Sequence, residues 1–136
     1  MDATPGIFDR ANLLAAEFAD RATLHDRDAS FPFENFDRLS EAGLLALTVP
    51  AALGGSGAGA RDAARILNIF GKADPSTALV LSMHYIQHLV MARSTRWPGR
   101  LARLKWTIDG NCVAGFKEKF PVNPVPGVEP NSARKR

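Results

Sequence analysis

Apolar residues recur every three or four positions through most of residues 5–93, and this spacing places them on one face of an α-helix. The first such segment spans about residues 5–25 and starts at Thr4-Pro5, a hydroxyl N-cap followed by a proline at the first helical position. Charged side chains occupy its opposite face. Its apolar positions are Ile7, Phe8, Ala11, Leu14, Ala15, Phe18, Ala19 and Ala22. The pattern predicts a surface helix with one buried stripe.

Three more segments carry the same spacing. A short helix is predicted after Phe31-Pro32, and Gly43 suits the left-handed position that ends it. A third is predicted over about residues 60–72. A fourth is predicted from Asp74-Pro75, which repeats the cap-and-proline start, to about residue 93. The stripes contain Phe33, Phe36, Leu39 and Ala42 in the second helix, Ala63, Ile66, Leu67 and Phe70 in the third, and Leu79, Ser82, Ile86, Leu89 and Val90 near one side of the fourth.

These elements predict an all-α fold, an irregular bundle of four to five helices, in which Trp97-Pro98 could open the fifth. We assign residues 1–105 to one helical domain. Residues 106–136 form a divergent tail, with weak strand character at 106–116 and then four prolines, at positions 121, 124, 126 and 130. Because neither a helix nor a central strand tolerates that proline density, we expect the Pro-rich basic tail to be extended or disordered.

Composition indicates a globular protein. The chain has 136 residues, of which 46% are apolar and 23% charged, and no apolar run is long enough to span a bilayer. A single cysteine, Cys112, favours a reducing cytoplasm. Residues 1–92 hold seven Lys/Arg against eleven Asp/Glu, whereas residues 93–136 hold ten against three. The basic residues lie among prolines rather than along a helix face, so we expect no nucleic-acid partner.

Candidate chemistry is sparse. The glycine-rich loop, residues 54–59, lacks both the spacing of a dinucleotide-binding turn and the Lys-Ser/Thr of a P-loop, so we interpret it as a connector. His84 and His88 share a helix face, but no third ligand accompanies them, and we expect no metal site. Either histidine could instead donate a hydrogen bond or a proton to a bound cofactor. Nothing suggests an activated thiolate at Cys112, and we assign no catalytic residue.

A series of motifs resembles the N-terminal helical domain of the acyl-CoA dehydrogenase family over about residues 10–104. The order of the motifs carries the resemblance, since each alone is common; one departure is Leu53, where the family often has an aromatic residue. The matching stretches are Phe31-Pro32, Leu39, Gly43-Leu44-Leu45, Val49-Pro50, Gly54-Gly55-Ser56-Gly57, Asp74-Pro75-Ser76-Thr77-Ala78 and His84.

The resemblance implies an FAD-dependent oxidoreductase that dehydrogenates acyl thioesters between the α and β carbons. Its middle β-domain and its C-terminal bundle with the glutamate base find no match here, so we expect a truncated or frame-shifted member that is inactive and retains no flavin by itself. The fourth helix helps to line the substrate cavity in this family. The lining candidates that follow are Ser82, Met83, His84 and His88, with Tyr85 directed away from the Ser82 side.

Two alternatives stay open. The same pattern occurs in flavin-dependent monooxygenases of this fold, where a helix histidine such as His84 or His88 could stabilise a flavin–oxygen adduct. A non-catalytic helical interaction module is the other. The resemblance implies an acyl-CoA or another small apolar substrate in the full-length family. A domain without its neighbours should expose apolar side chains, so we also expect self-association.

Overall fold

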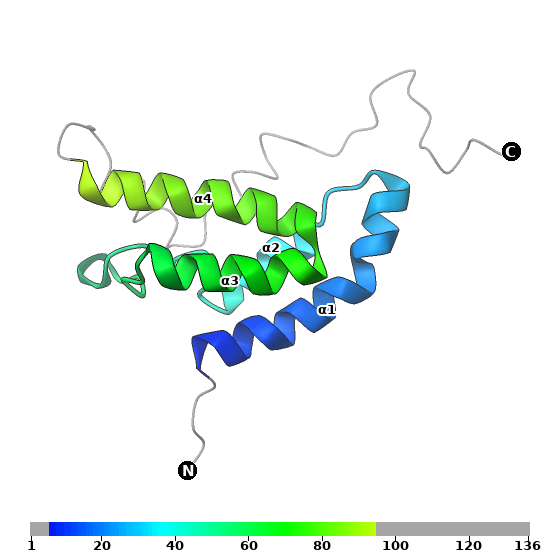
Figure 1. The fold of residues 1–136 in the computed structure, drawn as a ribbon, viewed down its shortest axis with the longest axis horizontal. Coiled ribbons are helices and arrows are strands. Elements are labelled where there is room, and N and C mark those ends of the chain that lie inside the picture. Colours follow the sequence, from blue (N-terminus) through cyan, green and yellow to red (C-terminus); the bar gives the residue numbers. More distant parts are fainter. Residues whose placement is uncertain (1–5, 95–136) are drawn as a thin grey trace, which may run out of the picture.

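The computed structural model describes residues 6–94, which form four α-helices and one short 3₁₀ turn (Figure 1). The helices are α1 (Ile7–Asp28), α2 (Phe33–Glu41), α3 (Ala60–Ala73) and α4 (Pro75–Arg93), and the 3₁₀ turn η1 spans Ala51–Leu53. No strand occurs among these residues, which confirms the predicted all-α class. The predicted fifth helix at Trp97-Pro98, the strand-like segment at 106–116 and the proline-rich tail lie outside the described residues.

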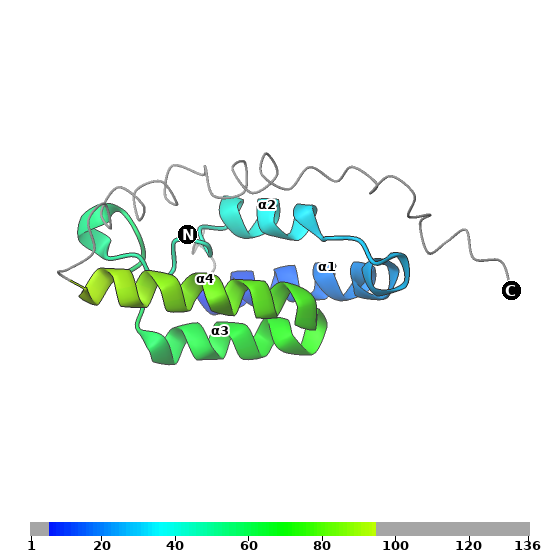
Figure 2. The ribbon, with the colours of Figure 1, turned by 90° about the horizontal axis from the view of Figure 1, so that it is seen from above.

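Helix α3 and helix α4 lie side by side and antiparallel, joined by Asp74 alone, and α1 packs along the other side of α3 (Figure 1). Seen from above, α2 lies on one side of α1 and α4, and α3 lies on the opposite side (Figure 2). Phe18 of α1 stacks on Phe70 of α3 with ring centroids 5.3 Å apart. The remaining core members from the helices are Ala11, Leu14, Ala15, Phe36, Leu39, Ala63, Ile66, Ala78, Leu81 and Tyr85.

Most helix boundaries agree with the predicted ones. Asp74 caps α4, because its Oδ1 accepts hydrogen bonds from the backbone N–H groups of Ser76 and Thr77. Gly43 follows α2 with φ +73°, a left-handed conformation that suits glycine. Helix α1 continues one turn further than predicted, to Asp28. The predicted start of this helix at Thr4-Pro5 lies outside the described residues, and the described helix begins at Ile7.

The side of α4 that faces the core is not the one that carries the apolar stripe of the sequence pattern. The core-facing residues are Thr77, Ala78, Leu81, Tyr85, His88 and Met91. Leu79, Ile86 and Val90 are all more than half exposed. Helix α4 is apolar on both sides, so periodicity alone could not select the buried side.

Residues 44–50 pass through the core without regular secondary structure. Leu44, Leu45, Leu47 and Val49 are all buried there. Buried carbonyl groups outside a helix or sheet need other hydrogen-bond donors, and two side chains of α4 supply them. The hydroxyl of Tyr85 donates to the carbonyl of Leu44 at 2.7 Å, and Nε2 of His84 lies 2.9 Å from the carbonyl oxygen of Leu45. Helix α4 therefore holds this segment in place.

Candidate functional site

The structure brings two of the four predicted lining residues together. The rings of His84 and His88, one turn apart on α4, meet edge to face with their centroids 4.1 Å apart. His88 is only 3% exposed, whereas His84 is half-buried. Because a carbonyl oxygen only accepts hydrogen bonds, Nε2 of His84 carries a proton and donates it to Leu45. His84 and His88 thus lie together on one side of α4, beside the buried segment 44–50; this side is called the histidine edge of α4.

Ser82 and Met83 lie elsewhere on the helix. Successive residues of an α-helix are about 100° apart, so Ser82, Met83 and His84 point in three different directions. The hydroxyl of Ser82 donates to the carbonyl of Leu79 on its own helix at 2.7 Å. Met83 is 57% exposed and faces away from the core. The lining roles of Ser82 and Met83 stay predictions. Tyr85 is buried in the core, and because residues three apart on a helix are neighbours, it lies only about 60° from Ser82 around α4.

The glycine-rich loop is a connector, and most of its amide groups are already bonded. The N–H groups of Gly55, Ser56, Gly57 and Ala58 donate to carbonyl groups of residues 46–50 at distances of 2.8–3.2 Å. An anion cradle needs such groups to be unpaired and convergent, so these four cannot serve as one. The loop is therefore tied back onto the chain that precedes it.

No three residues of the types His, Cys, Asp and Glu gather within residues 6–94 in an arrangement that could hold a metal ion. In the same residues no helix has the length and apolar character needed to cross a bilayer.

A buried polar cluster, which the sequence pattern did not reveal, joins three helices. Asn35 of α2 is fully buried, and its Nδ2 donates to Asp74 Oδ2 and to Thr77 Oγ1, each at 3.0 Å. Nη2 of Arg21 in α1 donates to the side-chain oxygen Oδ1 of Asn35 at 2.9 Å. Thr77 Oγ1 in turn donates to Asp74 Oδ2 at 2.7 Å. The cap predicted at Asp74 is thus also the centre of a tertiary network.

Hydrogen bonds control the charge of Asp74. Burial acts to raise the pKa of this carboxyl, but hydrogen bonds from the side chains and backbone of Ser76 and Thr77 outweigh burial, and the pKa lies below its ordinary value. Asp74 therefore stays ionised at neutral pH and acts as a hydrogen-bond acceptor. The Asp-Pro-Ser motif predicted the helix cap at Asp74. No sequence signal predicted its hydrogen bond with Asn35, which lies 39 residues away.

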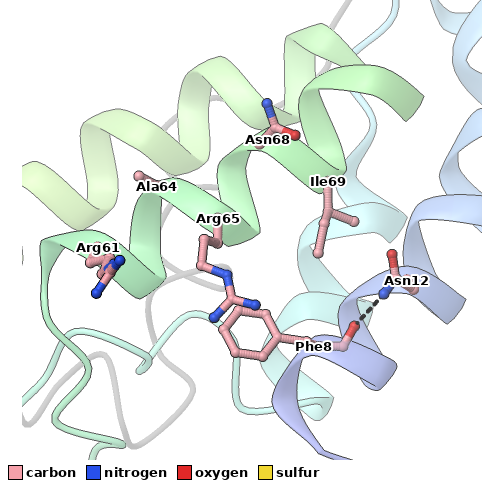
Figure 3. A pocket seen from close by; sticks show the side chains of 7 residues that line it. All are labelled: Phe8, Asn12, Arg61, Ala64, Arg65, Asn68 and Ile69. Atoms are coloured by element: carbon pink, nitrogen blue, oxygen red, sulfur yellow. Dashed lines mark hydrogen bonds between the residues drawn. The ribbon is translucent and has the colours of Figure 1, made fainter.

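The residues that the structure describes also line two open surface pockets elsewhere. One, of about 590 Å³, lies between α1 and α3, where the guanidinium group of Arg65 stacks over the ring of Phe8 at 4.0 Å from its centroid (Figure 3). Its other lining residues are Asn12, Arg61, Ala64, Asn68 and Ile69. The second, of about 670 Å³, lies between the end of α1 and the start of α4 and includes His25 and Ser30. Neither pocket includes a predicted lining residue.

The chain resembles several curated proteins over part of their length. It is 31% identical over 102 residues to a probable FMNH2-dependent monooxygenase from Pseudomonas putida, a match that covers 71% of this chain and 26% of that protein. It is 39% identical over 61 residues to an acryloyl-CoA reductase (NADH) from Anaerotignum propionicum, covering 45% and 16%. It is 41% identical over 80 residues to an L-evernosamine nitrososynthase from a Micromonospora strain, covering 58% and 17%.

These matches span about a quarter or less of the length of each relative. No solved structure showed significant similarity to the chain. The family profile for the acyl-CoA dehydrogenase N-terminal domain matches residues 10–94, most of the chain and all but the first turn of the described fold. The chain therefore belongs to the acyl-CoA dehydrogenase N-terminal domain family.

Proposed function

We propose that this chain is the N-terminal helical domain of an FAD-dependent oxidoreductase that dehydrogenates acyl thioesters. The observation that carries the proposal is the family match over residues 10–94, which coincides with four helices packed around one core. The edge of α4 that holds His84 and His88 is the part we assign to the substrate cavity. Residues 44–50, which His84 and Tyr85 fasten to α4, support that edge.

By itself the chain is inactive under this proposal. Dehydrogenation of this kind needs a carboxylate base as well as a flavin. The buried carboxylate of the described residues, Asp74, is committed to its cap and to Asn35. Four amide groups of the glycine-rich loop, those of residues 55–58, might have approached a phosphate but are bonded to residues 46–50. These groups are therefore not available to a flavin, and we assign its cradle to other parts of a complete enzyme.

Purification of the full chain provides the first test. The expected protein is colourless, and added FAD or FMN keeps its free fluorescence. A yellow protein with a flavin absorbance band would contradict the assignment of the flavin cradle to other domains.

A chimera tests the function itself. Residues 6–94 would replace the matching domain of the acryloyl-CoA reductase, and the flavin content and turnover of the chimera would be compared with those of the parent. Retained flavin and turnover support the proposal. In that chimera His84→Ala should mainly raise the KM for the thioester, and Leu13→Ala, an exposed position on α1, serves as the control. A folded, flavin-loaded chimera without turnover favours the non-catalytic interaction module.

A second candidate function is a flavin-dependent monooxygenase. The specific observation in its favour is the match over 102 residues, which is to a probable FMNH2-dependent monooxygenase. In a chimera with that protein, His84→Ala should uncouple oxygen consumption from product formation while KM changes little. An unchanged coupling ratio would remove the support for a histidine role in oxygen chemistry.

We also propose a cytoplasmic location, because the chain has a single cysteine, and self-association through the apolar side chains that the described fold exposes. In a complete enzyme we expect an acyl-CoA or another small apolar molecule as substrate.

A further inference from the structure

Three side chains at the turn between α1 and α2 form a chain of hydrogen bonds. Nδ1 of His25, in the last turn of α1, lies 2.8 Å from the hydroxyl oxygen of Ser30. Nε2 of the same ring lies 2.7 Å from Oε1 of Glu34, in the first turn of α2. A hydroxyl next to a histidine that a carboxylate orients is the arrangement that activates a serine as a nucleophile. In serine proteases the serine meets Nε2 and the carboxylate meets Nδ1, so the two ring nitrogens have exchanged partners here.

The charge of Glu34 sets the position of the proton on the His25 ring. Burial acts to raise the pKa of the Glu34 carboxyl, but its backbone hydrogen bond and the contacts with His25 and Arg21 outweigh burial, and the pKa is lowered. The ionised carboxylate only accepts hydrogen bonds, so Nε2 carries a proton. In the neutral ring Nδ1 then has a lone pair and accepts from the Ser30 hydroxyl. His25 is thus held in the tautomer that can act as a base toward Ser30.

A pocket gives small molecules access to this serine. Ser30 and His25 both line the pocket of about 670 Å³ between the end of α1 and the start of α4, a volume within the range of small-molecule sites. Ser30 is exposed, whereas the His25 side chain is only 12% exposed. Two acidic residues, Asp26 and the ionised Asp74, also line the pocket, and their charge favours an uncharged ligand over an anionic one.

The surroundings of Ser30 limit which esters it can attack. Attack on an ester makes a negatively charged oxygen, which enzymes stabilise with hydrogen-bond donors. Two N–H groups of the lining residues are already bonded, that of Ser30 to the carbonyl of His25 and that of Ser76 to Asp74. Without these donors the reaction favours activated esters, whose leaving group departs easily.

We propose that Ser30, activated by His25 and Glu34, is a nucleophile that hydrolyses small uncharged activated esters through an acyl-serine. Ser30 Oγ attacks the carbonyl carbon while Nδ1 of His25 takes the hydroxyl proton, the bond to the leaving oxygen breaks, and a phenolate departs. His25 passes its proton to the solvent and then accepts one from a water molecule that attacks the acyl-serine. That proton goes to Ser30 Oγ as the acid leaves. One ester and one water thus give one acid and one phenol, and nothing is oxidised or reduced.

Hydrolysis of p-nitrophenyl acetate by the full chain tests the proposal. Every chain carries Cys112→Ala, because a free thiol also attacks aryl esters. The expected result is release of p-nitrophenolate faster than in buffer, with an acetyl group found on Ser30 by mass spectrometry after acid quenching. Ser30→Ala should lower the excess rate at least about tenfold. Ser56→Ala, at an exposed serine of the glycine-rich loop, should leave it within about twofold.

Two further variants test the histidine and the carboxylate. His25→Ala should slow the acetylation of Ser30 about a hundredfold, the usual contribution of a positioned base. In Glu34→Gln the amide can donate to Nε2, which moves the ring proton to Nδ1 and removes the base. The ¹⁵N chemical shifts of the His25 ring should report this change of tautomer together with the loss of acetylation, and a merely structural contact would not couple the two.

The contrary outcomes are distinct. An unchanged rate in Ser30→Ala, or acetyl groups on lysines and none on Ser30, would overturn the proposal and leave the three residues as a structural contact of the turn. Relative to its rate in buffer, the anionic ester p-nitrophenyl hemisuccinate should acylate Ser30 at least about tenfold more slowly than the acetate, and equal rates would overturn the preference for uncharged esters. No step uses a flavin, so failure here leaves the proposed function standing, and failure of the chimeras leaves this site standing.

Discussion

At the scale of single residues, Asp74 both caps a helix and takes part in a buried hydrogen-bond network between helices. Its Oδ1 caps the start of α4 by accepting from Ser76 and Thr77, and its Oδ2 accepts from Asn35 and from the hydroxyl of Thr77. A buried polar group such as Asn35 is tolerated only while its hydrogen bonds are made. The cap and the tertiary network are therefore coupled, and loss of one carboxylate removes both.

Replacement of Asp74 by alanine should lower the free energy of unfolding by about 2–4 kcal/mol. The loss of the cap accounts for about 1 kcal/mol, and the buried donors left on Asn35 and Thr77 account for the rest. Urea unfolding followed by circular dichroism measures the change. Ser76→Ala, which removes one exposed donor to the same carboxylate, should cost less than about 1 kcal/mol. Equal effects of the two substitutions would show that the network contributes nothing beyond the cap.

At the scale of elements, two backbone segments of the irregular chain between α2 and α3 approach each other closely. Gly55 lies against Val49, and a Cβ atom added to Gly55 would come 2.2 Å from the carbonyl oxygen of Val49. Gly57, with φ +66°, turns the loop so that its N–H reaches that same carbonyl. The glycines thus allow two backbone segments to approach each other, and this approach anchors the start of α3.

Substitution of Gly55 by alanine should destabilise the fold by about 2 kcal/mol or more, because the backbone of residues 49–55 must move to admit the methyl group. The control is Gly71→Ala in α3, where the nearest neighbour of the added Cβ is 4.0 Å away. Alanine favours a helix over glycine, so this variant should gain about 0.5–1 kcal/mol. Thermal or urea unfolding of both variants gives the comparison. If Gly55→Ala proved as stable as the parent, the close approach to Val49 would be disproved.

At the scale of the whole molecule, polar contacts connect the helices around one end of the bundle. Arg21 of α1, Asn35 of α2 and Asp74 before α4 form one chain of hydrogen bonds. Nearby, His25 Nε2 lies 2.7 Å from Oε1 of Glu34, which links α1 to α2 a second time. Burial acts to raise the pKa of Glu34, but a backbone hydrogen bond and His25 outweigh it, so this pKa too is lowered.

Acid should therefore loosen the bundle at this end. A carboxyl whose pKa is lower in the folded than in the unfolded chain stabilises the fold above its ordinary pKa, 3.8 for Asp74 and 4.5 for Glu34, and loses this contribution as the pH falls through the folded value. We expect the free energy of unfolding to be steady near neutral pH and to fall below about pH 4.5. Urea titrations at successive pH values measure the slope.

The Asp74→Asn variant should show a shallower fall with acid, because an amide does not titrate but can still accept at the cap. The exposed substitution Asp20→Asn, which keeps both carboxylates, serves as the control. A slope for Asp74→Asn equal to that of the parent would mean that acid acts through other groups.

Neighbouring residues in the sequence determine where some of the helices begin and end. Asp74-Pro75 starts a helix because the carboxylate and the proline act on residues within one turn, and Gly43 ends one because its own φ is positive. Most of the buried stripes of α1, α2 and α3 could also be predicted from the sequence, because each of these helices has a mainly apolar and a mainly polar side, although Ala19, predicted in the stripe of the first helix, is exposed. Family membership followed from the order of such local signals along the chain.

The tertiary structure alone decided which side of α4 is buried. This helix is apolar nearly all round, so either Leu79 and Ile86 or Leu81 and Tyr85 could have filled the core. The side with Leu81 and Tyr85 is buried because segment 44–50 has buried carbonyl groups, to which the side chains of His84 and Tyr85 can donate hydrogen bonds. Such hydrogen bonds, like that between Asn35 and Asp74, join residues about forty positions apart, and no local pattern encodes a contact over that distance.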